Sequence, residues 1–296
     1  MKIFDCFMYF NEDLILEIRL NELYNRVDKF IIVESSYTHS GDFKEYNFDI
    51  KKFDKFKDKI TYIKIKEKPK EYLEVGENLT KGEKKNIQIL NALILENFQR
   101  NQIFKGLNEA DDDDFIIVSD LDEIPNLKNV DLNQHKSEII VFNQVFFHYR
   151  LNLYLKELPW FGSKCCTKKL LKSPQWLRNI KSKKYNFLRI DTLFSEKKYQ
   201  NIYIVKNGGW HFTTINNEEG IIYKLKSYLH HADTPDDLLN KGIFEGLIKE
   251  RKFLFDHNVD KGGDKYTNKK DLSIFDFDLL PNYIKNNKDL FKDWIV

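Results

Sequence analysis

Residues 111–125 read DDDDFIIVSDLDEIP, and this stretch decides the fold that the sequence predicts. The apolar run at residues 115–118 has the length and the β-branched content of a buried strand. Three carboxylates, Asp120, Asp122 and Glu123, come directly after it. Open α/β sheets bind their ligands at the carboxyl ends of their strands, so we expect these carboxylates at such a crevice.

Carboxylate oxygens clustered in this way suit Mg²⁺ or Mn²⁺ held against a phosphate. A second interpretation is open on spacing alone, because a polar strand end can also cap the helix that follows. The pattern recurs at Asp276-Phe277-Asp278 with no apolar strand before it, and we interpret that copy as a solvated turn. Residues 111–114 are expected to form an exposed acidic loop.

The composition is that of a packed globular protein. The chain has 296 residues, 42% of them hydrophobic and 15% aromatic, and no Pro- or Ser-rich linker divides it. We therefore predict one domain over residues 1–296, with a nucleotide-binding half at about 1–125 and an acceptor-binding half at about 126–296. With 48 basic against 46 acidic residues, nothing indicates a nucleic-acid partner.

The N-terminal stretch MKIFDCFMYF is too short to span a bilayer and contains Asp5, so we expect a core strand there and no transmembrane segment. The three cysteines, Cys6, Cys165 and Cys166, have neither a disulfide framework nor the Cys-x-x-Cys spacing of a zinc site. Buried thiols in a reducing, cytoplasmic setting are the expectation.

The first half alternates strand-like and helix-like segments. Helices are predicted at 12–27 and 83–104, and strands at 30–33, 60–65 and 115–118. This order favours an α/β fold with a mostly parallel central sheet flanked by helices. The helical faces expected to be buried carry Leu16, Leu20, Leu23, Tyr24 and Val27 in the first helix, and Ile87, Leu90, Ile94 and Phe98 in the second.

The second half is less regular. Strands are predicted at 138–147 and 202–205, and residues 160–178 mix aromatic with basic side chains. A helix is predicted from Glu218 onward. Its inward face is expected to carry Ile221, Ile222, Leu225 and Leu229.

The sequence Gly208-Gly209-Trp210-His211 follows the second of these strands. Glycines allow a backbone to approach a ligand closely, Trp210 offers a flat apolar platform, and His211 has a nitrogen that could complete a metal's coordination. The alternative for His211 is a core histidine. Glu34 ends a predicted strand, and the guanidinium of Arg100 could reach a uridine or a diphosphate; for both, the alternative is a surface ion pair.

Phosphate-loop, dinucleotide-fingerprint and nucleophile-elbow motifs are absent from the sequence, which counts against P-loop kinases, Rossmann oxidoreductases and α/β-hydrolases. The chain instead resembles glycosyltransferase family 17 over residues 10–230. The segments that carry the resemblance are Phe10-Asn11-Glu12 with Leu16, Arg19, Leu20, Glu22 and Leu23; Asp28, Val33-Glu34-Ser35, Thr38 and Gly41; Arg100; residues 115–117 with Asp120 and Asp122-Glu123-Ile124-Pro125; and Gly209-Trp210-His211 with Glu219-Gly220, Lys224 and Leu225.

The resemblance implies a GT-A-type fold and an inverting transfer of a sugar, with N-acetylglucosamine indicated, from a uridine-diphosphate donor. It implies that Asp120 and Asp122 form an Asp-x-Asp motif for Mn²⁺ or Mg²⁺, with Asp122 as the direct ligand and Asp120 nearer the ribose or a metal-bound water. It further implies His211 as a third ligand. The remaining implied site residues are Phe10, Asn11, Glu34 and Arg100 around the nucleotide sugar, and Trp160, Gly209 and Trp210 around the acceptor.

An inverting transfer also needs a base for the acceptor hydroxyl. Glu219, at the start of a predicted helix, is the first candidate, followed by Glu123 and Asp233; the alternative for Glu219 is a helix N-terminal carboxylate. The expected acceptor is a surface polysaccharide, a lipopolysaccharide or a related glycan, and peripheral contact with a membrane is compatible with it. A sugar-nucleotide nucleotidyltransferase and a non-catalytic glycan-binding protein are the alternative functions.

Overall fold

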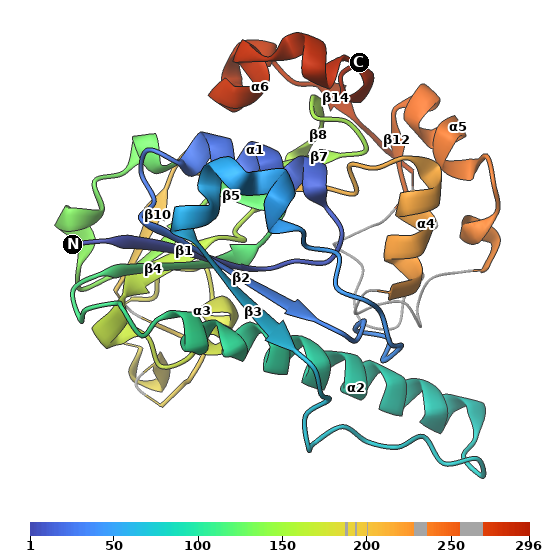
Figure 1. Ribbon diagram of the computed structural model, residues 1–296, viewed down its shortest axis with the longest axis horizontal. Coiled ribbons are helices and arrows are strands. Elements are labelled where there is room, and N and C mark those ends of the chain that lie inside the picture. The colour runs from blue at the N-terminus through green and yellow to red at the C-terminus, as the bar shows by residue number, and fades with distance from the viewer. Residues whose placement is uncertain (187–188, 193, 200, 228–235, 255–268) are drawn as a thin grey trace.

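Two large β-sheets form the centre of the structure, a computed structural model that describes residues 1–186, 189–192, 194–199, 201–227, 236–254 and 269–296 (Figure 1). One sheet has seven strands and the other has five, and a two-stranded ribbon pairs β12 (Lys252–Phe253) with β13 (Lys270–Asp271). The predicted α/β fold, with a large sheet flanked by helices, is confirmed.

The seven-stranded sheet is parallel over the strands that come from the first half of the chain. Neighbouring strands run in the order β3-β2-β1-β4, all parallel, and the order continues through β9, β6 and β10. Strand β9 runs antiparallel to both of its neighbours. The strands are β1 (Ile3–Met8), β2 (Lys29–Ser35), β3 (Ile60–Ile65), β4 (Phe115–Asp120), β6 (Ile139–Phe142), β9 (Lys164–Thr167) and β10 (Ile202–Val205).

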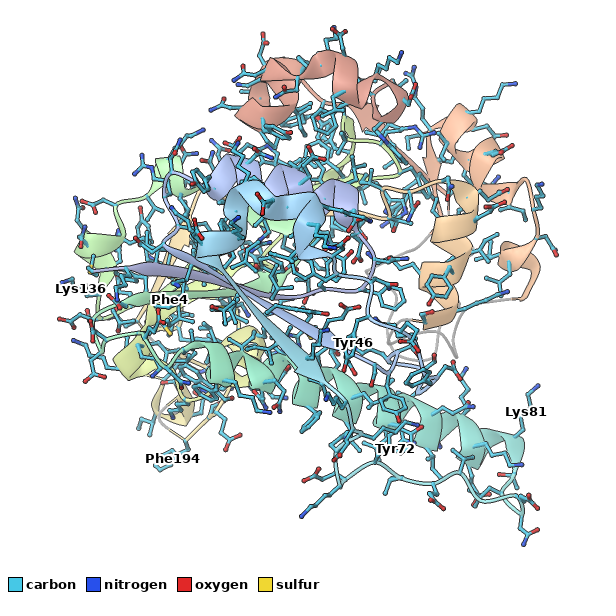
Figure 2. All side chains as sticks on the ribbon, in the orientation of Figure 1. Phe4, Tyr46, Tyr72, Lys81, Lys136 and Phe194 are labelled. Carbon is cyan, nitrogen blue, oxygen red and sulfur yellow. The ribbon has the colours of Figure 1, made fainter. Side chains whose placement is uncertain are left out.

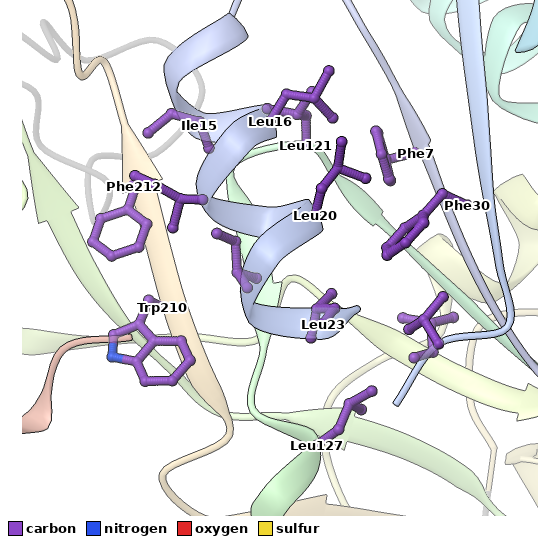
Figure 3. Close-up of a cluster of buried hydrophobic side chains, with 14 of the residues drawn as sticks. Phe7, Ile15, Leu16, Leu20, Leu23, Phe30, Leu121, Leu127, Trp210 and Phe212 are labelled. Carbon is purple, nitrogen blue, oxygen red and sulfur yellow. The ribbon is translucent and has the colours of Figure 1, made fainter. Parts of the chain in front are cut away.

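Helices cover both faces of this sheet (Figure 1). Helix α1 (Asp13–Leu23) lies on one face, with α6 (Asn282–Asn286) packed against it. On the other face, α2 (Lys81–Asn101) contacts β2, and α3 (Pro174–Asn179) contacts β4. Alternate side chains along each strand supply the two cores, because successive residues of a strand point to opposite faces. Three residues of the predicted inward face of α1 are buried as expected, and Figure 3 shows Leu16, Leu20 and Leu23 in that core. The helix ends at Leu23, before the predicted end at residue 27, so Tyr24, which is half-buried, and Val27, which is buried, lie beyond it.

The predicted inward face of α2 is wrong in part. Leu90 is 46% exposed, whereas Asn91, Leu95, Gln99 and Arg100 are buried. The N-terminal half of α2 projects beyond the sheet, so only its C-terminal half packs against β2 (Figure 1). The side chains that this half turns inward include the polar ones of Gln99 and Arg100.

The predicted strand over residues 138–147 is two strands in two different sheets. Strand β6 ends at Phe142, and β7 (Gln144–His148) belongs to the five-stranded sheet. Between them, Asn143 donates its backbone N–H to Val205 and accepts from the N–H of Gly208, so the chain crosses to the second sheet beside the turn after β10. The other strands of that sheet are β5 (Glu123–Pro125), β8 (Leu153–Trp160), β11 (Gly209–Thr213) and β14 (Ser273–Ile274).

The acidic stretch before β4 is not wholly a solvated loop. Asp111, Asp112 and Asp113 are exposed as expected. Asp114 is buried, and its side chain accepts from the backbone N–H groups of Lys2 (2.6 Å) and Asp111 (2.9 Å). This carboxylate therefore ties the chain's first residues to the start of β4.

Three further expectations concern the second Asp-x-Asp copy, the cysteines and membrane-spanning helices. The later Asp-x-Asp copy is exposed, and Asp276 caps a short 3-10 turn by accepting from the N–H of Asp278. Cys6, Cys165 and Cys166 are buried free thiols, as predicted. Among the residues described, none of the helices is both long and apolar enough to cross a bilayer. Helices α4 (Glu218–Ser227) and α5 (Ile243–Glu250) lie beside the second sheet (Figure 1).

Candidate functional site

A cavity of about 640 Å³ lies where the carboxyl ends of β1, β2 and β4 meet the second sheet. Met8, Ser35 and Asp120 line it from the three parallel strands, which confirms a crevice at the strand ends. His211 of β11 and Lys224 of α4 face these residues from the other side. The cavity therefore has one wall from each half of the chain.

Asp120 is held between two guanidinium groups. Its Oδ1 accepts from Arg100 Nη2 and its Oδ2 from Arg178 Nη2, each at 2.9 Å. Burial alone would raise the pKa of this carboxyl, but the positive charges of Arg178 and Arg100 outweigh that effect and lower it to about 2. Asp120 is therefore an anion whose two oxygens are already oriented by α2 and α3.

Glu123 lies beneath Asp120 and is fully buried. It accepts from Arg178 Nη1 (2.8 Å), Trp160 Nε1 (2.7 Å) and the backbone N–H of Asp120 (2.8 Å). It is not among the residues that line the cavity. This carboxylate orients Arg178 and Trp160, and the position differs from the cavity-facing one expected of a catalytic base.

Asp122 lines the cavity and contacts His211 of β11 and Lys224 of α4. Its Oδ1 lies 3.5 Å from His211 Nε2, and its Oδ2 lies 3.3 Å from Lys224 Nζ. Burial would raise the pKa of Asp122, but Lys224 and His211 hold it well below its usual range. Lys224 also lies 3.2 Å from Glu12 Oε1, and the two carboxylates raise the pKa of its ammonium against the effect of burial.

His211 is enclosed by aromatic rings. It stacks on Trp160 with ring centroids 4.5 Å apart and meets Phe146 edge-on at 5.0 Å. Its Nε2 faces Asp122, whereas Nδ1 is buried with no hydrogen-bond partner within the described part of the chain. The imidazole is thus enclosed by aromatic rings with one nitrogen directed at Asp122.

The sequence profile of glycosyltransferase family 17 matches residues 1–257 of the 296. The chain belongs to glycosyltransferase family 17. No curated protein sequence matches it. Membership makes the protein a glycosyltransferase and implies a sugar donor and an acceptor, so it favours glycosyl transfer over the nucleotidyltransferase and glycan-binding alternatives.

A divalent cation would find two of its ligands in this cavity. Asp122 Oδ1 and His211 Nε2 are close enough to bind one ion, since each bond to such a metal is about 2 Å long. Both oxygens of Asp120 are bonded to guanidiniums, which leaves Asp122 as the carboxylate available for direct ligation. No three ligating side chains gather within the described residues. Two protein ligands nevertheless fit a Mg²⁺ or Mn²⁺ that completes its shell with water and phosphate.

One side of the cavity is lined by Asp120, Phe10 and Lys44, and we call it the polar wall. The Phe10 ring stacks on Tyr223 of α4 with centroids 5.4 Å apart, and Lys44 Nζ lies 5.6 Å from the ring's centre. Glu34 lies behind this wall, fully buried, where it accepts from Lys44, from two backbone N–H groups and from the Tyr62 hydroxyl. Phe10 and Lys44 line the cavity, whereas Glu34 and Asn11 do not.

Besides Asn11, Glu34 and Glu123, four further expected site residues do not line the cavity or lie outside the described residues. Trp210 packs in the core and donates to the carbonyl of Leu279 (3.0 Å), because neighbours in a strand face opposite sides and His211 faces the cavity. Gly209 does not line the cavity; its backbone lies close to that of β5, with which β11 pairs. Glu219 is exposed and does not line the cavity. Asp233 lies outside the described residues, as does Leu229.

Sequence reasoning assigned no individual role to Arg178, Lys224, Lys44 or His39. His39 lines the cavity, hydrogen-bonds Gln99 and has a pKa lowered by burial. Arg178 and Lys224 reach the carboxylates from segments more than 50 residues away. Charge complementarity to Asp120 and Asp122 was the available signal, but 48 basic residues in the sequence offer it equally.

Proposed function

We propose that this glycosyltransferase is metal-dependent and inverting, and that it moves a sugar from a uridine-diphosphate sugar to a glycan acceptor. N-acetylglucosamine is the sugar that the family resemblance indicates. The observation that carries the proposal is the pairing of Asp122 with His211 in a cavity at the ends of parallel strands. Its volume, about 640 Å³, suits a ligand of this size.

The polar wall supports the donor assignment. Asp120 is preoriented by Arg100 and Arg178 toward hydroxyl or water ligands, and Phe10 offers a ring face at the mouth of the same wall. Asp122 and His211 would hold the cation, which neutralises charge on the departing diphosphate. Lys224 supplies a further positive charge beside Asp122. The parallel order β3-β2-β1-β4, with Asp-x-Asp at the end of β4, supports a GT-A-type arrangement.

The aromatic wall supports a sugar acceptor. Trp160, Phe146 and His148 line the half of the cavity opposite β1 and β2. Flat aromatic faces of this kind suit the apolar face of a sugar ring. With Asp120 and Asp122 assigned to the donor, Glu12 and Glu96 are the described carboxylates left facing the cavity, and we propose one of them as the base.

Calorimetric titration with the uridine-diphosphate sugar, with and without Mn²⁺, tests this function. Wild type is expected to bind the donor only with Mn²⁺, and Asp122→Asn is expected to weaken that binding by at least about tenfold, because it removes a charged ligand. The matched control is Asp278→Asn, which alters the exposed Asp-x-Asp copy. Metal-independent binding, or an Asp122→Asn variant equal to wild type, would contradict the proposal.

Activity measurements separate the two candidate bases. Glu12→Gln or Glu96→Gln, whichever removes the base, is expected to abolish transfer while donor binding persists. Glu219→Gln should retain transfer, because its side chain is exposed outside the cavity. Loss of transfer in Glu219→Gln alone would return that residue to the catalytic role that the sequence suggested.

A further inference from the structure

One segment of the chain has a charge very different from the rest. Residues 164–206 contain 12 Lys and Arg against 2 Asp and Glu. The remaining residues contain 36 Lys and Arg against 44 Asp and Glu. The near-neutral total therefore hides a strongly basic segment on an otherwise acidic molecule, and a partner for this segment is expected to be anionic.

The exposed part of this segment forms one continuous surface. The backbone N–H of Lys181 donates to the carbonyl of Lys197 (2.7 Å), which brings the two ends of residues 181–198 together. Lys198 lies 5.9 Å from the centre of the Tyr185 ring. Toward α3, Tyr199 meets Trp176 edge-on. We call this the basic aromatic surface; it comprises Lys172, Trp176, Lys181, Lys183, Lys184, Tyr185, Arg189, Lys197, Lys198 and Tyr199.

Two large apolar side chains project from the same surface. Phe194 is 85% exposed and Ile190 is 68% exposed. Figure 2 shows Phe194 directed away from the body of the molecule, on the opposite side from Lys81. Exposed apolar side chains surrounded by lysines combine an apolar contact with an electrostatic one in a single surface.

We propose that the basic aromatic surface binds an anionic lipid bilayer. Phe194 and Ile190 would enter the interface, and the surrounding lysines would lie at the level of the anionic headgroups. A nucleic acid would satisfy the lysines, but it offers no apolar environment for the aliphatic side chain of Ile190. The only acidic residues between 181 and 198 are Asp191, which pairs with Arg189 and Lys198, and Glu196.

The surface is coupled to the glycosyl-transfer site through α3. Arg178 lies three residues before Lys181, and it contacts Asp120 and Glu123 at the cavity's floor. Docking through this surface would hold the enzyme at a bilayer that could carry a lipid-attached acceptor, through the segment that follows the helix orienting Asp120. Binding to the bilayer would not depend on which sugar donor the enzyme uses.

Vesicle sedimentation tests the proposal on the full chain. Vesicles of phosphatidylcholine mixed with phosphatidylglycerol are compared with vesicles of pure phosphatidylcholine, at low and at physiological salt. The wild-type protein is expected to sediment with the anionic vesicles only, and less at the higher salt because salt screens exposed charges.

Two variants separate the electrostatic and the apolar contributions. Lys181, Lys183 and Lys184 changed together to Glu are expected to weaken binding by at least about 100-fold, since each cation near the headgroups contributes about fivefold. Phe194→Ser is expected to weaken it by about tenfold or more. The matched controls are Lys81, Lys84 and Lys85 changed to Glu, on the exposed end of α2, and Phe43→Ser, which alters another exposed aromatic.

Retained melting temperatures would show that the variants fold, and the controls are expected to bind like wild type. The proposal is overturned if wild type ignores anionic vesicles or binds both vesicle types equally. It is also overturned if the two test variants bind like the controls. Equal binding to a single-stranded oligonucleotide that Phe194→Ser does not change would identify a general polyanion surface instead.

Discussion

The Arg19 guanidinium holds the backbone that carries the site's carboxylates. It pairs with Asp5 of β1 through two nitrogens, at 2.7 and 2.6 Å, and both side chains are fully buried. Its Nη1 donates to the carbonyl oxygens of Asp120, Leu121 and Glu123 at 2.9 to 3.1 Å. The turn from β4 to β5 therefore depends on a charge supplied by α1.

Arg19→Met is expected to lower the free energy of unfolding by about 3–5 kcal/mol, because it leaves the Asp5 carboxylate buried and unpaired. Urea unfolding measures this change. The double variant Arg19→Met with Asp5→Leu should regain part of the loss, because it removes the uncompensated charge. A single variant as stable as wild type would show that Asp5 tolerates burial without its partner.

Asp120 gives the stability a defined dependence on pH. Its pKa is about 2 in the folded protein, because Arg178 and Arg100 outweigh the effect of burial, and about 3.9 in an unfolded chain. The folded pKa is the lower one, so this contribution is fully present above pH 4 or so and is lost as the pH falls toward about 2. We expect the unfolding free energy of Asp120→Asn to fall less over this window than that of wild type. Parallel curves in urea titrations at several pH values would contradict the assignment.

Individual residues were predictable where a local pattern marks them. Asp120 and Asp122 follow an apolar strand, and His211 follows two glycines, so all three could be identified as site candidates. Trp210 was assigned to the site because of its neighbours, yet strand alternation turns it into the core. Deciding between Trp210 and His211 requires knowing which face of β11 the cavity occupies.

At the scale of elements, the close antiparallel pairing of β11 with β5 requires a glycine at position 209. Gly209 has φ +133°, and a Cβ atom there would lie 2.1 Å from the carbonyl oxygen of Ile124. Gly209→Ala is therefore expected to lower the free energy of unfolding by about 2–3 kcal/mol or more, through both backbone strain and overlap. Urea unfolding of the variant and of the wild type measures this difference in free energy.

Gly246 of α5 provides the matched control, since a Cβ atom there would meet no atom within 4 Å. Gly246→Ala is expected to be neutral or to stabilise the protein by about 0.5–1 kcal/mol, because alanine is the better helix former. Equal effects of the two substitutions would show that the close approach of β11 to β5 is not what requires glycine.

Elements with clear ends were predicted well. The strands at residues 60–65 and 202–205 have the expected bounds, because polar or turn-forming residues stop their apolar runs. The run at 138–147 was predicted as one strand because nothing local interrupts it. Its division at Asn143 follows from backbone pairing with Val205 and Gly208, which are far along the chain.

At the scale of the whole molecule, one core joins the two ends of the chain. Phe7 of the first strand, Trp210 of β11 and Phe291 near the C-terminus belong to the same buried cluster. We therefore expect the predicted nucleotide-binding and acceptor-binding halves to unfold together.

Urea unfolding followed by two probes tests this cooperativity. All four tryptophans lie after residue 126, so their fluorescence reports the second half, while circular dichroism also detects α1 and α2. Coincident transitions are expected. Separate midpoints for the two probes would divide the chain into two folding units.

The sequence by itself determined the α/β class, the strand that ends on Asp-x-Asp, and the family resemblance, because these depend on local periodicity and on ordered motifs. Only the tertiary structure decided which charges meet. Arg178 and Lys224 reach Asp120 and Asp122 across more than 50 residues, and Glu219 is left in solvent. Such pairings depend on how sheets and helices pack, and a sequence with many lysines and carboxylates leaves them undetermined until the fold brings particular ones together.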